Sequence, residues 1–251
     1  MAINLRVSFN PYSGDNGLVG FANVIFNGEY ALEGVKIREG KYGPLVELPR
    51  YPISRKDENG NPVKDQSGKQ LYDYKDVLHP TSPEINAAFS KLIKQEYINV
   101  KNGISSPKVG TDYQMDGSFE ISNVYVTPLD REDNLVGLGT VHFGNKFVFN
   151  KVRIKMGDKG LYVEGDKYRD LDKYENGDPI LNDKGEHQFV YRPYFHAITT
   201  ETYEMLRDCI VDELNRKTTY GQKQTNEQTL GYNNSADDFI PFIENNQGQG
   251  R

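Results

Sequence analysis

The chain contains two copies of one sequence pattern, and this duplication constrains the fold more than any other feature. The segment LVGFANVIF begins at Leu18, and a close echo, LVGLGTVHF, begins 117 positions later at Leu135. The same offset places the polar loop at 56–70 opposite the loop at 173–187. Self-similarity at one fixed offset, without a gap through most of each copy, indicates two tandem domains of the same fold.

Each copy is expected to form antiparallel strands followed by one helix. Residues 18–38 alternate apolar and polar side chains around Asn27-Gly28, which predicts a β-hairpin. Ser82 and Pro83 are suited to cap and begin a helix. The predicted apolar stripe of this helix is Ile85, Ala88, Phe89, Leu92, Ile93 and Tyr97, and that of the second copy is Thr202, Met205, Leu206, Cys209, Ile210 and Leu214.

The predicted fold class is α+β, with two pseudo-twofold related domains. Each domain is an antiparallel sheet with a protruding hairpin and one C-terminal helix. We expect the first copy at 1–99, a linker rich in Gly and Ser at 100–118, the second copy at 119–217 and a disordered acidic tail at 218–251. The two sheets are expected to meet edge to edge and to set their hairpin arms beside each other.

Charge and cysteine content limit the possible functions. The net charge is −6, and residues 1–117 hold 14 basic and 14 acidic residues, so the remainder carries the whole excess. This balance argues against a protein that is basic throughout, but it leaves room for local basic patches. Cys209 is the single cysteine, which excludes an internal disulfide framework. No apolar run reaches the length of a membrane span, so we expect a cytoplasmic protein without membrane contact.

Residues that could support catalysis have structural interpretations that we favour. The sequence contains no nucleophile elbow, phosphate-binding loop or zinc motif. His79 and His196 recur at matching positions, where an imidazole commonly holds a turn by hydrogen bonding. Glu47 and Glu164 also recur, without a convergent acid–base partner. We therefore expect no catalytic residue, no cofactor and no metal.

The order of elements resembles a known family. EYALEGVKIREGKYGPLVELP (29–49) and YKDVLHPTSPEINAAFSKLIKQEY (74–97) resemble the SpoVG family of septation and sporulation regulators, and the resemblance covers most of residues 5–97. The second copy, about 119–215, is more divergent, with His196-Ala197 where the first copy has His-Pro. The resemblance implies DNA and RNA binding and homodimers with paired sheets. A tandem chain would then be a monomer that mimics the family homodimer, and further association stays open.

The resemblance associates nucleic-acid contacts with the basic segment before the His-Pro pair. Cations that track phosphates, together with aromatic faces on which bases stack, form the usual single-strand platform. A solvated arm whose lysines only confer solubility is the alternative. The candidate residues are Arg50, Tyr51, Arg55, Lys56, Lys64, Lys69, Tyr72, Tyr74 and Lys75 in the first copy, and Lys167, Tyr168, Arg169, Lys173, Tyr191 and Arg192 in the second.

The tail carries a second motif. NNSADDFIPF (233–242) resembles the acidic tip of bacterial single-stranded DNA-binding proteins, although IENNQGQGR follows it here. In such tips acidic residues meet a basic rim on a partner and apolar residues fill a pocket. A tail that docks on its own domain is the alternative. The residues concerned are Asp237, Asp238, Phe239, Ile240, Pro241 and Phe242.

These features predict a non-enzymatic protein that binds single-stranded DNA or another nucleic acid. The tail would recruit replication, recombination or repair proteins. One alternative is a sequence-specific DNA or RNA regulator that acts at the transcriptional or post-transcriptional level. Another is a protein-interaction module without nucleic-acid binding.

Overall fold

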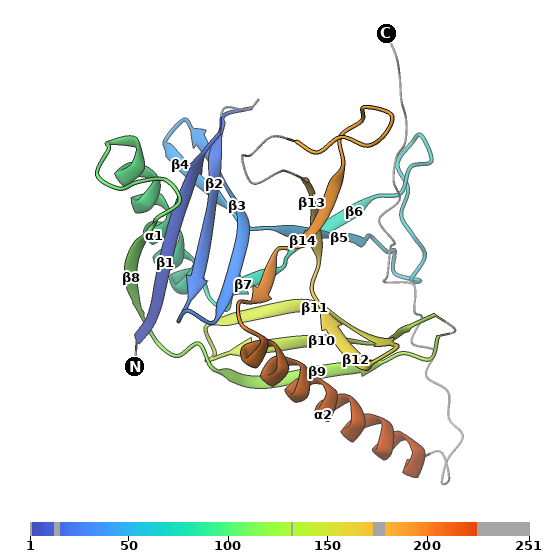
Figure 1. Cartoon of the computed structure of the whole chain (residues 1–251). Coiled ribbons are helices and arrows are strands. Elements are labelled where there is room, and N and C mark those ends of the chain that lie inside the picture. The colour runs from blue at the N-terminus through green and yellow to red at the C-terminus, as the bar shows by residue number, and fades with distance from the viewer. Residues whose placement is uncertain (1, 13–15, 132, 173–178, 225–251) are drawn as a thin grey trace.

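The computed structural model describes residues 2–12, 16–131, 133–172 and 179–224, and Figure 1 shows two β-rich bodies, each followed by one helix. The predicted α+β class is confirmed. The first copy contains β1 (Ala2–Pro11), β2 (Leu18–Phe26), β3 (Tyr30–Gly40), β4 (Gly43–Glu47), β5 (Arg50–Ser54), β6 (Tyr72–Asp76), β7 (Leu78–Pro80) and α1 (Pro83–Lys101), after which β8 (Thr111–Asp116) follows. The second copy contains β9 (Ile121–Pro128), β10 (Leu135–Phe143), β11 (Phe147–Gly157), β12 (Gly160–Glu164), β13 (Lys167–Leu171), β14 (Phe189–Pro193), β15 (Phe195–Ala197) and α2 (Thr200–Gln224).

The two copies exchange one short strand each. The first sheet has the order β15-β3-β2-β1-β8 with β4 also on β3, and the second has β12-β11-β10-β9 with β7 on β11. Leu78 of β7 pairs with Phe149 in the second copy, and Phe195 of β15 pairs with Leu32 in the first. The expectation of two sheets that meet edge to edge is therefore wrong.

The exchange fills a gap that each copy leaves on its own sheet edge. β4 covers β3 only at 36–40, and β15 pairs with β3 at 30–32. In the same way β12 covers β11 at 153–157, and β7 pairs with it at 147–149. Because buried backbone groups need hydrogen-bond partners, the strand of the other copy completes each edge.

The predicted hairpin turn is confirmed. Asn27 and Gly28 have φ angles of 52° and 74°, the left-handed values expected at the two central residues of the turn that the Glu29 N–H closes on the Phe26 carbonyl. In the second copy Gly144 and Asn145 adopt 51° and 54° at the equivalent turn. The two hairpins place β2 and β10 at the centre of their sheets.

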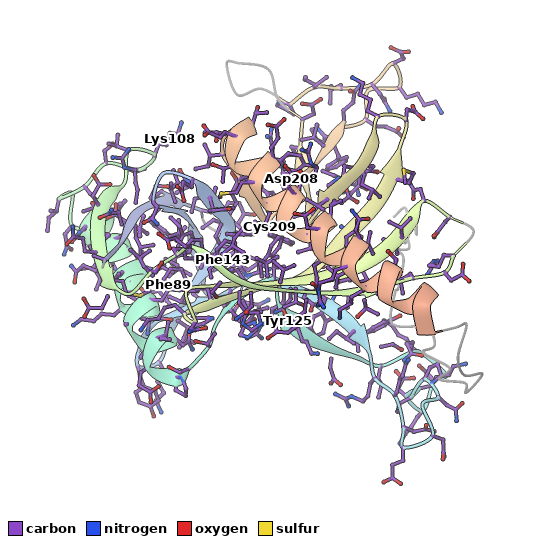
Figure 2. The ribbon with its side chains drawn as sticks, turned by 90° about the horizontal axis from the view of Figure 1, so that it is seen from below. Phe89, Lys108, Tyr125, Phe143, Asp208 and Cys209 are labelled. Carbon is purple, nitrogen blue, oxygen red and sulfur yellow. The ribbon has the colours of Figure 1, made fainter. Side chains whose placement is uncertain are left out.

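Both helices begin at a side-chain cap. The Ser82 hydroxyl accepts from the Ile85 N–H at 3.3 Å, and Thr199 Oγ1 accepts from the Thr202 N–H at 3.1 Å. The predicted stripes need correction at Ala88 and Met205, which are exposed, because the buried faces centre on other positions. Cys209, labelled in Figure 2, is half-buried rather than fully buried. The buried helix residues are Phe89, Ile93, Glu96, Tyr97, Thr202, Leu206, Ile210 and Leu214.

The segment expected to be a linker contains a strand. β8 pairs with β1, with Leu5 opposite Tyr113, and extends the first sheet. The carboxylate of the fully buried Glu96 accepts from the Tyr113 hydroxyl at 3.1 Å and from Ser105 Oγ at 2.8 Å. The linker interpretation is wrong for 111–116 because this segment buries Met115 and satisfies a carboxylate of α1.

The boundary of the predicted tail also moves. Residues 218–224, assigned to the tail from composition, continue α2. Residues 225–251, with the whole acidic motif, lie outside the described residues.

A cluster of aromatic rings joins the two copies in one core. Phe119 stacks on Phe26 with centroids 4.2 Å apart and on Phe143 with centroids 4.5 Å apart. Tyr30 stacks on Phe195 at 5.6 Å. All of these side chains are buried, and burying each contributes about 1.5–3 kcal/mol. The halves therefore share a single hydrophobic core.

Over the part of the chain that the structure describes, neither α1 nor α2 has a stretch long and apolar enough to cross a membrane.

Candidate nucleic-acid interface

Each arm is a two-stranded ladder, β5–β6 in the first copy and β13–β14 in the second. Beyond the first ladder, Asp57 Oδ1 accepts from the N–H groups of Asn59 and Asn61, which fixes one turn. Asp65 fixes the next turn by accepting from Ser67 and Lys69. These hydrogen bonds hold the pKa of both carboxyl groups below their ordinary value. The carboxylates of the arm loop thus support its shape.

Several predicted cations are paired with carboxylates on their own arm or next to it. Arg50 lies 2.8 Å from Asp76 and Arg55 lies 2.5 Å from Asp73. In the second arm Lys167 lies 2.5 Å from Glu164, and Arg192 lies 3.1 Å from Asp170. Residues 50–76 carry six basic and five acidic residues, and residues 167–192 carry five and six. The arms are nearly neutral as a whole, so any phosphate contact depends on local groups.

The remaining cations divide into two groups. Lys64, Lys69 and Lys75 are exposed and form no ion pair with any residue that the structure describes. Lys56 is half-buried and its backbone bridges to Pro62. Arg169 stacks on Phe189, 3.5 Å from the ring centre. Lys173 lies outside the described residues.

Two predicted tyrosines, one buried and one half-buried, contact the other copy rather than standing exposed. Tyr51 is buried, and Lys151 Nζ lies 4.7 Å from the centre of its ring. Tyr168 donates its hydroxyl hydrogen to Glu33 Oε2 at 2.7 Å. Burial raises the pKa of Tyr51 to about 12 and also raises that of Tyr168. Each of these two residues contacts a side chain of the other copy, so the contacts favour a structural role over base stacking.

The remaining tyrosines keep exposed faces. Tyr74 is 63% exposed and Tyr191 is 51% exposed, which leaves ring surface for a base. Tyr72 is half-buried. The single-strand platform predicted from the sequence is thus reduced to one exposed tyrosine near the root of each arm.

An open groove of about 760 Å³ lies where the first arm meets α1. It brings together three predicted residues, Arg50, Tyr74 and Lys75, with the N-terminal end of the helix. The positive end of a helix dipole favours an anion. The other lining residues are Asp76, His79, Pro80, Thr81, Ser82, Pro83, Asn86 and Asn150.

The floor of this groove combines the two copies. Asn150 of β11 donates from Nδ2 to the Asp76 carbonyl at 3.0 Å and contacts His79 Nδ1 at 2.8 Å. With Asn150 as the donor, the neutral His79 ring carries its proton on Nε2. Burial lowers the pKa of His79, so the ring is neutral at pH 7. His79 thus has a structural hydrogen bond, but with Asn150 of the other copy rather than within a local turn as expected.

The equivalent position in the second copy is charged. Glu33 stands where Asn150 stands, and His196 Nε2 lies 3.5 Å from its Oε1. This carboxylate raises the pKa of His196, and His196 in turn lowers the pKa of Glu33. A carboxylate paired with a histidine ring therefore closes the floor where the first groove has an amide and a neutral ring.

A cationic row on the outer face of β11 is not among the residues predicted from the sequence. Arg153 Nη1 lies 2.8 Å from Asp166, and Lys155 lies 2.7 Å from Glu164. Lys151, half-buried beside them, has a lowered pKa because of desolvation. The alternating sequence KVRIK could have revealed the row, since every second residue of a strand shares a face.

The arms meet at their roots and diverge at their tips. Lys151 lies over Tyr51 of the first arm and 3.5 Å from Asp166, next to the start of the second. In Figure 2 the tips of the two arms point to different sides of the molecule. The expectation of arms set side by side holds only at the roots, so the two arms do not form one continuous track.

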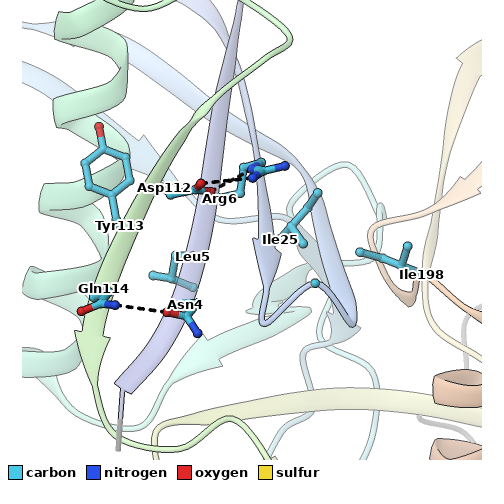
Figure 3. A pocket seen from close by; sticks show the side chains of 9 residues that line it. Asn4, Leu5, Arg6, Ile25, Asp112, Tyr113, Gln114 and Ile198 are labelled. Atoms are coloured by element: carbon cyan, nitrogen blue, oxygen red, sulfur yellow. Dashed lines mark hydrogen bonds and ion pairs between the residues drawn. The ribbon is translucent and has the colours of Figure 1, made fainter.

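Figure 3 shows another hollow, of about 680 Å³, at β1 and β8. Arg6 and Asp112 pair there through hydrogen bonds of 2.8 and 3.1 Å, and Gln114 donates to Asn4 at 3.4 Å. None of the predicted nucleic-acid residues lines it. Among the described residues, no group of three or more His, Cys, Asp or Glu side chains could hold a metal ion.

Comparison with known proteins bears on the first copy. The SpoVG family model matches residues 1–99. These residues form a SpoVG-family domain. A protein of Clostridium novyi (strain NT) named "Putative septation protein SpoVG" is 26% identical over 106 residues, which are 42% of this chain and 90% of the relative. No solved structure matches. The SpoVG match includes β1 to β7 and most of α1, and the second copy is recognised by the internal repeat and the shared topology.

Proposed function

We propose that this protein binds nucleic acid, with single-stranded DNA in replication, recombination or repair as its ligand. The observation that carries the proposal is the open groove in which exposed Tyr74 lies with Lys75 and Arg50. An aromatic face beside cations suits a base and its flanking phosphates.

The ion pairs on the arm are compatible with this role. Arg50 is 56% exposed beside Asp76, and exposed pairs contribute only about 0–1 kcal/mol. A phosphate can therefore replace the Asp76 carboxylate as the partner of Arg50, or share the Arg50 guanidinium with it, at low cost in free energy. Lys75 needs no such exchange because it pairs with no carboxylate among the described residues.

A fluorescence-anisotropy titration tests the proposal, with single-stranded and duplex oligonucleotides at several salt concentrations. Two groove cations predict a slope of log K against log salt of about −1.4, and four, with Lys64 and Lys69, about −2.8. Binding to single strands should be tighter than to duplexes. Absence of salt-sensitive binding would refute the proposal.

The tail has a proposed role of its own. Residues Asp237 to Phe242 would recruit replication or repair proteins, as their resemblance to an acidic tip implies. Deletion of 233–251 should preserve or strengthen DNA affinity and abolish capture of such partners. Loss of DNA affinity on deletion would contradict the proposal that the tail binds partner proteins and not DNA.

A sequence-specific DNA or RNA regulator is the second candidate, and the SpoVG domain at 1–99 favours it. It predicts tighter binding to one duplex or transcript than to scrambled controls in the same titration. A third candidate, a module that binds protein alone, predicts no affinity for either single-stranded or duplex oligonucleotides.

A further inference from the structure

The groove at the root of the first arm has a counterpart position at the root of the second arm, defined by the residues 117 positions later and called the second groove. Arg50, Tyr74 and Lys75 of the first correspond to Lys167, Tyr191 and Arg192 of the second at the offset of 117. A symmetric body would offer two identical sites. The side chains around these positions have diverged in three ways that bear on binding.

The floors differ in charge. Asn150 presents an amide to the first groove, whereas its counterpart Glu33 presents a carboxylate to the second. That carboxylate accepts from Tyr168 at 2.7 Å and lies 3.5 Å from His196. A phosphate that approached it would meet negative charge, whereas the amide repels no anion.

The walls differ in size and polarity. Asn86 on α1 lines the first groove, and its counterpart on α2 is Tyr203. Tyr203 packs against the core, and its hydroxyl contacts the Val163 N–H at 3.2 Å. Thr81 of the first groove is replaced by Ile198, which instead lines the hollow in Figure 3. The second copy has thus lost polar groups from this wall.

The cations of the second groove are more fully engaged. Lys167 and Arg192 each have a carboxylate partner, at 2.5 and 3.1 Å. In the first groove only Arg50 is paired, and Lys75 is exposed without a carboxylate among the described residues. An anion therefore encounters a less neutralised surface in the first groove.

We infer that only the groove of the first arm holds the nucleic acid, and that the second groove is a sealed contact between the two copies. The inference rests on the proposed function. It assigns Tyr74 as the base-stacking residue and Lys75 as a phosphate contact, with one strand bound per chain. The Glu33–His196–Tyr168 contacts then join the copies and bind no ligand.

The duplication supplies a matched control for each substitution. Tyr74→Ala should lower affinity for a single-stranded oligonucleotide of about 10 nucleotides by about 5- to 150-fold, since one stacked base contributes about 1–3 kcal/mol. Tyr191→Ala should change affinity less than about twofold. Lys75→Ala should lower affinity and reduce the salt slope by about 0.7, whereas Arg192→Ala should leave the slope unchanged. All four positions are exposed, so melting temperatures should stay near that of the unmodified chain.

The outcomes separate the inference from the proposal beneath it. Loss of affinity in the Tyr74 and Lys75 variants but not in the Tyr191 and Arg192 variants, with one oligonucleotide bound per chain at saturation, supports a single groove. The inference is overturned, while nucleic-acid binding stands, by any of three results. These are equal losses of affinity at the paired positions, larger losses of affinity in the second copy, or two oligonucleotides bound per chain. If the unmodified chain binds no oligonucleotide, the proposed function fails and this inference fails with it.

Discussion

Phe119→Ala tests whether the two copies share one core. The ring is 1% exposed and stacks on Phe26 and Phe143, which belong to different copies. Truncation of a buried Phe costs about 3–5 kcal/mol, and each aromatic pair adds about 0.5–1.5 kcal/mol beyond its buried area. With two stacked pairs lost, we expect about 4–5 kcal/mol. For a chain of this size the loss corresponds to a fall in Tm of about 8–20 °C.

Urea denaturation followed by far-UV circular dichroism and by tyrosine fluorescence is the appropriate assay. Because Phe119 contacts rings of both copies, both probes should report one transition that moves to lower urea. Tyr42→Ala is the control, since Tyr42 is 93% exposed and should change stability by no more than about 0.5 kcal/mol. A loss below about 1.5 kcal/mol, or two transitions of which one stays in place, would refute the shared core.

Three further substitutions test contacts that hold the site. Ser82→Ala should cost about 1 kcal/mol through loss of the α1 cap, measured as a lower urea midpoint, and an unchanged midpoint would contradict the cap. His196→Gln should lower Tm most between about pH 4.5 and 6.5. Because the pKa of His196 is raised in the folded state, its contribution to stability is complete below pH 6.5 and is lost as the pH rises through that folded-state pKa. Because the pKa of Glu33 is lowered, the contribution of Glu33 is lost as the pH falls below 4.5. A Tm difference that grows toward pH 9 would show that the pair is wrongly assigned. Lys151→Met should cost about 1–2 kcal/mol of stability by removing the cation over the Tyr51 ring. The control Lys155→Met should cost less than about 1 kcal/mol, because Glu164 keeps Arg153 and Lys167 as partners. Equal losses of stability in the two variants would argue against the Tyr51 contact.

Local features were predictable from the sequence because their causes are local. The Asn27-Gly28 turn and the Ser82 cap follow from the conformations that these residues adopt within a few positions. The strand exchange was not predictable in this way. β7 and β15 are three residues each, and their partners lie about 70 and 160 residues away in the sequence. A repeat is equally consistent with two closed sheets and with two sheets that trade a strand.

The candidate site shows the same limit. The sequence correctly placed cations and tyrosines on the arms, yet it could not tell Tyr51 from Tyr74. Both lie on strands of the first arm, but Tyr51 faces Lys151 from the other copy. Which face of an arm is covered depends on the docking of the second copy, and this is a tertiary property. Asn150 was missed for the same reason, because it reaches the groove only through the exchanged strand β7.

The contacts between the copies have diverged as matched sets. Gly34 and its counterpart Lys151 both keep positive φ angles, 74° and 54°, so the duplicated backbone is unchanged there. Tyr194 packs so closely on Gly34 that an added Cβ would lie 3.3 Å from its ring, whereas the residue equivalent to Tyr194 is the smaller Val77. The ring of Tyr194 thus faces glycine in one copy, whereas in the other copy the long side chain of Lys151 reaches the ring of Tyr51. Lys151 tolerates a conformation that costs a non-glycine residue about 1–2 kcal/mol, which its contacts with Tyr51 and Asp166 offset. In a homodimer one sequence must serve both positions, and fusion into one chain removes that constraint, which is how a body built from two copies can carry a single groove.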